Sequence, residues 1–215
     1  MSYNKIGDIK AAQGDAPAAL AAYEDGLAIR KKLAAADPTN TEWQRDLSVS
    51  YNKIGDIKAA QGDAPAALAA YEDGLAIRKK LAEADPTNTA WQRDLSVSYN
   101  KIGDIKAAQG DAPAALAAYE DGLAIAKKLA AADPTNTEWQ RDLSVSYERI
   151  GDIKAAQGDG SAALAAYEDG LAIRKKLAAA DPTNTAWQRD PSVSSRQDRR
   201  YQSGARRCPS RACRL

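Results

Sequence analysis

The 215-residue sequence contains no histidine and no phenylalanine, and it has only two cysteines and one methionine. The lack of histidine removes the commonest general base and the commonest metal ligand. Two cysteines are too few for a disulfide framework or a four-thiolate zinc site. No apolar run approaches the roughly 18 residues that a membrane span needs. These absences predict a protein with no metal, no cofactor and no membrane segment, and they argue against catalysis.

What the sequence does contain is a repeat of 48 residues, which the aromatic residues mark most clearly. One tyrosine and one tryptophan recur at this interval along the chain, at Tyr3, Tyr51, Tyr99 and Tyr147 and at Trp43, Trp91, Trp139 and Trp187. The sequence therefore predicts a repeat domain over residues 1–190, followed by an Arg-rich tail over 191–215. The predicted units are 1–48, 49–96, 97–144 and 145–190, of which the first and last are incomplete.

Each unit is expected to form two helices. Thr41 and Gln44 fit a capping box at the start of the first helix. Gly62 stands where that helix would end, and Pro65 falls in the first turn of the second helix. The Asp85–Pro86 pair ends the second helix, because the residue before proline avoids helical geometry. One such hairpin cannot bury its apolar faces alone, so the sequence predicts an all-α fold in which hairpins stack as an α-solenoid.

The spacing resembles the tetratricopeptide repeat, although that family's usual unit has 34 residues. The positions that carry the resemblance in the second unit are Tyr51, Ile54–Gly55, Gly62, Ala67, Tyr71 and Asp85–Pro86. The additional residues lengthen both helices by about two turns, which keeps their packing faces in register. The resemblance implies stacked antiparallel helix pairs in a right-handed superhelix, and a role in protein–protein interaction.

Residues that could carry chemistry have simpler structural interpretations. Gly55 and Gly62 lack the lysine and hydroxyl residue of a phosphate-binding loop, so a close helix contact and a helix cap are expected instead. The acidic pair Glu72–Asp73 precedes the basic run Arg78–Lys80 on one helix, which favours solvent-exposed ion pairs over paired catalytic carboxylates. At helical spacing Trp43 and its neighbours are expected in the core rather than on a stacking platform.

A polar ladder is the candidate binding site. The resemblance implies that the first helix of each repeat lines a concave groove, and the same polar residues recur along these helices. The ladder comprises Asn4, Asp8, Arg45, Asn52, Asp56, Arg93, Asn100, Asp104, Arg141, Glu148 and Asp152. Its aspartates favour a basic or extended polar peptide as the ligand. A solvated face that binds no ligand remains the alternative.

Both ends of the sequence depart from the repeat. Met1 stands at the repeat position that Val49 holds in the second unit. A GTG valine codon that serves as a start codon is read as methionine, so we expect Met1 to be such a start within a longer, bacterial-type array. Pro191 replaces the leucine found at Leu47, and the pattern is lost after Ser194. Residues 195–215 hold seven arginines and one aspartate, so the repeats themselves are mildly acidic although the whole chain has a net charge of +1.

The tail has two competing interpretations. One interpretation is an Arg-rich arm that binds nucleic acid. A metal site at Cys208 and Cys213 is not expected, because two cysteines without a histidine are too few ligands. Residues Gln197–Leu215 can be reverse-translated with freely chosen codons. When the resulting DNA is translated in a frame shifted by one base, it encodes KIGDIKAAQGDAPAALAA, which is the repeat itself. We therefore expect a frameshifted fifth repeat that is disordered and has no specific affinity for nucleic acid.

The sequence favours a non-catalytic scaffold that binds a protein or peptide. The alternative is a structural protein whose uncapped ends stack head to tail into filaments. An engineered consensus repeat is a third interpretation, against which the frameshifted tail argues. Because no signal peptide is recognisable, a cytoplasmic location is favoured.

Overall fold

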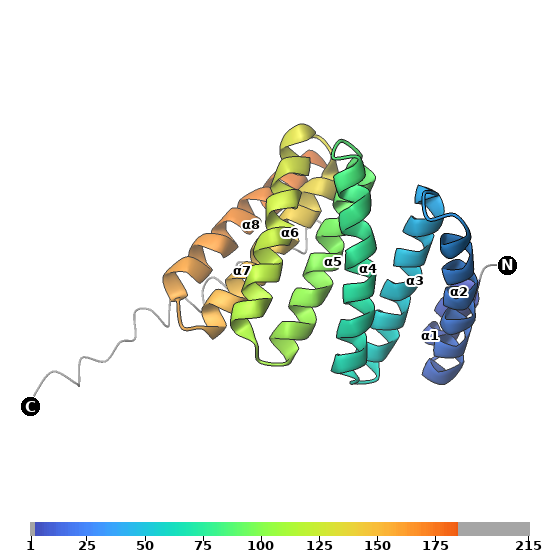
Figure 1. The fold of residues 1–215 in the computed structure, drawn as a ribbon. Helices are drawn as coiled ribbons and strands as arrows, with labels where there is room; N and C mark the ends of the chain where they lie inside the picture. Colours follow the sequence, from blue (N-terminus) through green and yellow to red (C-terminus); the bar gives the residue numbers. More distant parts are fainter. Residues whose placement is uncertain (1–2, 185–215) are drawn as a thin grey trace, which may run out of the picture. The chain divides into compact units, whose positions relative to one another are not determined.

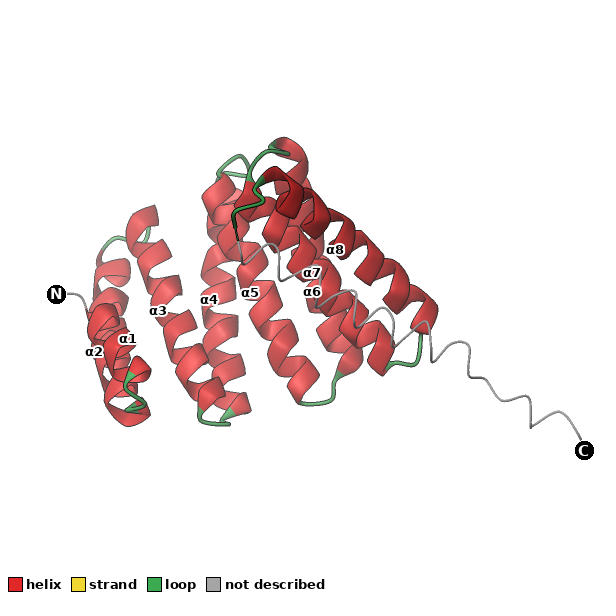
Figure 2. Cartoon of the chain, turned by 180° about the vertical axis from the view of Figure 1, so that it is seen from behind, coloured by secondary structure: helices red, strands yellow, loops and turns green. Residues whose placement is uncertain are grey.

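The computed structural model describes residues 3–184, in which the chain forms eight α-helices and no strand (Figures 1 and 2). The all-α prediction is therefore confirmed. None of these helices is both long and apolar enough to cross a membrane. The helices are α1 (Tyr3–Ala12), α2 (Ala16–Ala36), α3 (Thr41–Ala60), α4 (Ala64–Ala84), α5 (Thr89–Ala108), α6 (Ala112–Ala132), α7 (Thr137–Ala156) and α8 (Gly160–Ala180).

The chain divides into two compact units, Met1–Gly122 and Leu123–Leu215, with the boundary inside α6. In the first unit α1 packs on α2, α2 on α3, α3 on α4 and α4 on α5. In the second unit α7 packs on α8. The helices thus stack as pairs, as a solenoid requires. The frameshift predicted for the tail falls outside the described residues.

The start of the first helix of each repeat differs from the prediction. Asn40, not Thr41, is the N-cap of α3, and its Oδ1 accepts a hydrogen bond from the Trp43 N–H at 3.0 Å. Asn40 has the extended backbone typical of a cap, whereas Thr41 is already helical. Gln44 does not reach back to the cap, because its Nε2 donates to the carbonyl of Ala34 at 3.2 Å. The same cap recurs at Asn88 and Asn136.

The turn inside each repeat follows the prediction. Gly62 has φ +79°, a left-handed conformation that costs a glycine little and other residues more. Asp63 then caps α4, accepting the Ala66 N–H at 3.2 Å, and Pro65 lies in the first turn. Asp85 has extended backbone at the end of α4, directly before Pro86. Local sequence chemistry therefore sets the hairpin geometry.

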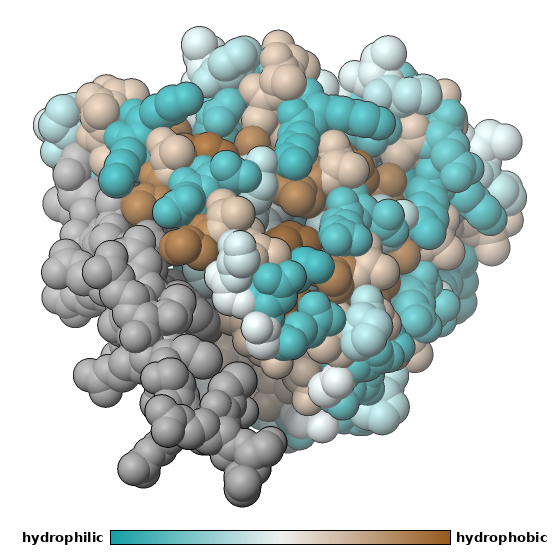
Figure 3. All heavy atoms as spheres, turned by 90° about the vertical axis from the view of Figure 1, so that its left-hand side faces the viewer, coloured by the Kyte–Doolittle hydropathy of each residue, from teal (hydrophilic) through white to brown (hydrophobic). Residues whose placement is uncertain are grey.

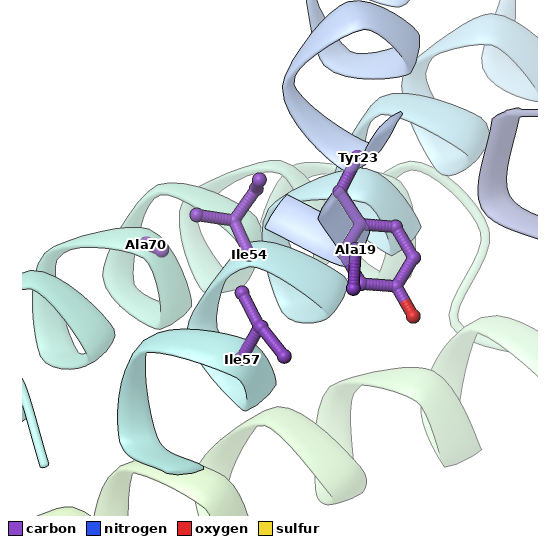
Figure 4. Close-up of a cluster of buried hydrophobic side chains, with 5 residues drawn as sticks. All are labelled: Ala19, Tyr23, Ile54, Ile57 and Ala70. Carbon is purple, nitrogen blue, oxygen red and sulfur yellow. The ribbon is translucent and has the colours of Figure 1, made fainter. Parts of the chain in front are cut away.

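Isoleucines of the first helix of one repeat fill the space between neighbouring hairpins. Ile54 and Ile57 of α3 are 9% and 7% exposed. They form one buried cluster with Ala19 and Tyr23 of α2 and with Ala70 of α4 (Figure 4). The cluster joins two successive repeats, so the core of the solenoid is continuous within this unit.

Gly55 lets the two helices of a repeat approach closely. The ring of Tyr71 lies against it, so that a Cβ built on Gly55 would lie 2.4 Å from Cε1 of the ring. Tyr71 is only 2% exposed. The close helix contact predicted for this glycine is confirmed.

An aspartate ends the second helix of every repeat and binds the threonine two residues later. The Asp37 carboxylate accepts the Thr39 backbone N–H at 3.0 Å and its hydroxyl at 2.7 Å. These bonds favour the ionised form and lower the pKa of the carboxyl. The pKa is lowered in the same way at Asp85, Asp133 and Asp181.

We expect these four aspartates to make the protein less stable in acid. Because their folded pKa lies below the unfolded value, they stabilise the fold above about pH 4, and this contribution is lost as the pH falls through the folded pKa. Replacing all four by asparagine should flatten the dependence of the melting temperature on pH between about 5 and 2. Circular dichroism during heating measures it. Replacing the exposed Asp25, Asp73, Asp121 and Asp169 is the matched control, and equal flattening there would contradict the assignment.

Candidate functional site

The aspartates of the predicted ladder lie on the first helix of each repeat, where each accepts a hydrogen bond from a tyrosine of its own hairpin. The Tyr–Asp distances lie between 2.6 and 2.8 Å in the pairs Tyr23–Asp8, Tyr71–Asp56, Tyr119–Asp104 and Tyr167–Asp152. The tyrosine follows its aspartate by 15 residues every time. The ladder aspartates are therefore built into the hairpin.

Two of these aspartates also bind a lysine of the next repeat. Lys53 Nζ lies 2.7 Å from Asp8 Oδ1, and Lys101 Nζ lies 2.7 Å from Asp56 Oδ1. Each pair joins the first helices of neighbouring repeats. The Asp8 and Asp56 side chains still remain 47% and 43% exposed.

The electrostatics of the ladder follow from these contacts. The bond from Lys53 lowers the pKa of Asp8, to which the Tyr23 hydroxyl also contributes. Burial, together with the bond to its aspartate, raises the pKa of Tyr23 and of Tyr71. These bonds favour the ionised form of Asp8 and the neutral form of the two tyrosines, whereas burial raises the pKa of Asp152.

In the first, second and fourth repeats the residue one turn before the aspartate faces an arginine of the second helix. Arg30 Nη1 donates to Asn4 Oδ1 at 3.2 Å. Arg78 Nη1 lies 2.7 Å from the Asn52 oxygen in the amide orientation that satisfies both groups. In the fourth repeat a glutamate replaces the asparagine, and Glu148 forms an ion pair with Arg174. In these three repeats this part of the ladder is consequently occupied within the hairpin.

Arg78 was predicted to form a solvent-exposed ion pair, and this is wrong. It is 4% exposed, and it donates to Ser48 Oγ at 3.2 Å, to Ser98 Oγ at 2.7 Å and to the carbonyl of Asp94 at 2.9 Å. Its neighbour Lys79 lies over the Tyr99 ring, 5.3 Å from the centroid. Arg78 therefore joins α3, α4 and α5, which the sequence reasoning missed.

The third repeat lacks this arginine, since alanine stands at position 126, one repeat after Arg78. Asn100 Oδ1, the counterpart of the atom that faces Arg78 in the second repeat, is buried and has no hydrogen-bond partner in the described part of the chain. Ser96 donates instead to the carbonyl of Gly122 at 3.0 Å. A repeat of this type can thus fold without the arginine, with one acceptor left unpaired.

The remaining arginines of the ladder differ in their surroundings. Arg45 Nε lies 2.7 Å from Asp94 Oδ2, and its side chain is 46% exposed. Arg93 is half-buried and Arg141 is exposed. The side chains of Asp8, Asp56 and Arg45 are thus each between 43% and 47% exposed, and Arg141 is exposed as well.

The first unit contains a small cavity. Its volume is about 330 Å³, and it opens between the loop after α2 and the C-terminal part of α4. Pro38, Thr39, Ile77, Leu81 and Ala84 are among the residues that line it. Its mostly apolar walls suit an aliphatic side chain.

Apolar side chains are exposed on the first hairpin. Ile6 and Ile9 of α1 are 37% and 51% exposed, whereas Ile54 and Ile57, their counterparts in α3, are 9% and 7% exposed. Tyr3 on the same helix is 40% exposed. This face of α1 therefore has the same residues as the face of α3 that packs against the preceding hairpin.

No group of three or more acidic or cysteine side chains in the described residues could hold a metal ion. The sequence likewise offers no histidine as a ligand. The contacts of the ladder are hydrogen bonds and ion pairs within and between hairpins, which hold the hairpins together.

Comparison with known proteins agrees with this geometry. The family model described as "Tetratricopeptide repeat" matches residues 1–38, 47–87 and 95–134, which together make up more than half of the chain. No curated protein matches the sequence.

Solved structures share the fold at low sequence identity. One is BtubC (BKLC) from P. vanneervenii, with a TM-score of 0.63 and 16% identity over 97% of this chain and 83% of that one. Another is a crystal structure of the nearly identical TPR-like repeats of a putative kinesin light chain from Podosopora anserina. Its TM-score is 0.62, with 18% identity over 96% of this chain and 95% of that one. Both similarities support the stacked-hairpin fold.

Proposed function

Because the chain belongs to the tetratricopeptide repeat family, we propose that it is a non-catalytic scaffold that binds another protein along the aspartate ladder. The observation that carries this proposal is the exposure of Asp8 and Asp56. Each carboxylate holds a lysine and a tyrosine, yet nearly half of each side chain remains accessible. An ionised carboxylate has about four acceptor positions, so two stay free for a ligand.

The partner that suits this surface is an extended, basic segment. Asp8, Asp56 and Asp104 recur at the same place on three successive first helices of the first unit. Lysine or arginine side chains of the partner would share the carboxylates with Lys53 and Lys101. Such contacts are charge-assisted but exposed, so the expected binding is weak for each contact and depends on salt.

Binding of a fluorescent lysine-rich peptide tests the proposal. Changing Asp8, Asp56 and Asp104 together to asparagine keeps the side-chain size and removes three charges. We expect the affinity for the peptide to fall by about tenfold at low salt, because each exposed pair contributes roughly 0.2–1 kcal/mol. Fluorescence anisotropy measures the dissociation constant, and circular dichroism checks that the helices remain.

The matched control neutralises Asp25, Asp73 and Asp121, which are exposed on the second helices of the same three repeats. It removes the same number of charges from another face. A fall in affinity that is equal in the two triple variants would mean that only net charge attracts the peptide, and the ladder would be rejected as a binding site.

Self-association through the ends of the solenoid is the second candidate function. It is favoured by the exposure of Ile6 and Ile9, whose counterparts in α3 are buried against the preceding hairpin. Apolar surface that is buried elsewhere in the same repeat pattern stabilises association when it is covered. Sedimentation at rising concentration tests it, and a mass that stays at the 22.9 kDa of one chain would contradict it.

A further inference from the structure

The cavity of the first unit has a mostly apolar floor and an exposed rim. Leu81 of α4 is 5% exposed, while Ile77 of the same helix and Gln44 of α3 are half-buried. The other lining residues are exposed and come from the loop after α2 and from α3 and α4: Pro38, Thr39, Thr41, Lys80 and Ala84. A ligand can therefore reach the floor from solvent.

Hydrogen bonds fix the wall that the loop contributes. The Thr39 backbone N–H and hydroxyl both donate to the Asp37 carboxylate, at 3.0 and 2.7 Å. Gln44 Nε2 donates to the carbonyl of Ala34 at 3.2 Å and to that of Pro38 at 3.4 Å. Because these bonds already order the loop, a ligand that enters the cavity pays little conformational entropy.

The volume of the cavity limits the size of its ligand. It measures about 330 Å³, and since one water molecule takes about 30 Å³ of the liquid, it holds about ten non-hydrogen atoms. This is the size of a single aliphatic chain. Apolar areas bordered by hydrophilic residues also occur elsewhere, as on the face of the molecule drawn in Figure 3. The apolar floor therefore does not identify the ligand by itself.

Lys80 adds the chemical selectivity that the floor lacks. It is the charged residue among those that line the cavity. Its two neighbours in the basic run are engaged, since Arg78 is buried and Lys79 lies over the Tyr99 ring. The Lys80 side chain is exposed, and within residues 3–184 it makes no ion pair or hydrogen bond. Its ammonium group is thus available to an anion at the rim.

We propose that this cavity binds a small aliphatic carboxylate, with the hydrocarbon chain over Ile77 and Leu81 and the carboxylate on Lys80. The chain covers apolar surface that otherwise faces water. The ion pair at the rim selects a negative head group, and the Thr41 hydroxyl can donate a second hydrogen bond to it. An acid of about eight carbons has the ten non-hydrogen atoms that the volume allows. The site is separate from the aspartate ladder, which favours a basic partner.

A titration of the full-length protein with octanoate, followed by methyl NMR, tests the site. The lining residue types recur in later repeats, so the signal to follow is that of Ile77, identified by its absence from the Ile77→Val variant. We expect octanoate to shift this signal until it saturates. Octylammonium has the same chain and the opposite charge, and it should bind about tenfold more weakly at low salt. Acetate lacks the chain and should leave the signal unchanged at the same concentrations.

Two cavity variants have matched controls in the first repeat. Lys80→Gln should weaken octanoate binding about threefold to fivefold, whereas Lys32→Gln changes the exposed counterpart in α2 and should have no effect. Ala84→Leu enlarges the last residue of α4, where the new side chain fills part of the cavity, and should weaken binding at least about tenfold. Ala36→Leu makes the same change at the last residue of α2 and should leave the affinity unchanged.

Three results would overturn the proposal. Equal affinity for octanoate and octylammonium would mean that Lys80 does not select the head group. A shift of the Ile77 signal that is the same in the wild type and in Ala84→Leu would mean that the chain does not enter the cavity, and no shift in the wild type would mean that octanoate does not bind there. The triple asparagine variant of the ladder should bind octanoate like the wild type, so failure of the ladder and failure of the cavity can be told apart.

Discussion

Gly55→Ala should destabilise the protein by about 2 kcal/mol, although alanine is normally the better helix former by about 1 kcal/mol. The reason is the position of the Tyr71 ring, whose atoms Cε1, Cδ1 and Cζ lie 2.4, 2.6 and 2.8 Å from the Cβ that the substitution adds. The ring has no easy way out, because it is buried and its hydroxyl is bound to Asp56 at 2.7 Å. The two helices must separate, which weakens the packing of the isoleucines on both sides.

Two other glycines provide controls that add the same methyl group. Gly160, the first residue of α8, has no atom within 4 Å of an added Cβ and does not need a positive φ, so its change to alanine should leave stability unchanged or raise it slightly. Gly62 also has open space, but its φ of +79° should cost about 1 kcal/mol when alanine replaces it.

Urea unfolding followed by circular dichroism measures all three variants. The curves need a nearest-neighbour model, since repeat arrays do not unfold in one step. Equal stability of Gly55→Ala and Gly160→Ala would contradict the close-contact assignment.

The order and ends of the helices could be predicted because they depend on local chemistry. Gly62, Pro65 and Asp85 each act within a few residues of their own position, and all three mark the predicted boundaries. The capping box failed because both Asn40 and Thr41 are good caps in sequence. The Gln44 side chain, which a capping box would place at the cap, bonds instead to the preceding helix.

The candidate site could be predicted only in part. The repeat placed Asp8 and Asp56 on one ladder, but their bonds to Lys53 and Lys101 join residues 45 positions apart. Hydropathy patterns do not report contacts of this kind. In retrospect the sequence does carry a signal, since a tyrosine 15 residues and a basic residue 45 residues after the ladder aspartate recur in successive repeats.

Arg78 is the clearest case of a residue whose environment its sequence conceals. A basic residue next to two lysines on an Ala-rich helix suggests a solvated face. The helix instead turns Arg78 between the first helices of two repeats, where its partners come from α3 and α5. Burial lowers the pKa of the guanidinium, but an arginine stays charged at any ordinary pH. Its hydrogen bonds to α3 and α5 all go to neutral oxygens, while the nearby carboxylates of Asp94 and Asp56 also favour the charged form.

Arg78→Met should destabilise the protein by about 2–3 kcal/mol, the second large effect that we expect. Methionine fills much of the same space, but it leaves the Asp94 carbonyl, the Ser98 hydroxyl and the Asn52 oxygen without their donor. Arg78→Lys keeps the charge with fewer donors in a fixed geometry, so its loss should be smaller. Urea unfolding under the same conditions as for the glycine variants measures both.

Arg30→Met is the matched control, because Arg30 is the counterpart of Arg78 in the first repeat. Arg30 is half-buried and donates to Asn4 at 3.2 Å, so its loss should cost less than about 1 kcal/mol. Ala126 already stands at this position in the third repeat, which means that the fold survives without the arginine. The expected result for Arg78→Met is therefore a weaker junction between the second and third repeats, seen as faster amide exchange in α3 and α5, while the helices remain. If Arg30→Met and Arg78→Met lose the same free energy of unfolding, helix preference or net charge causes the loss. The buried hydrogen bonds of Arg78 would then contribute nothing of their own to stability.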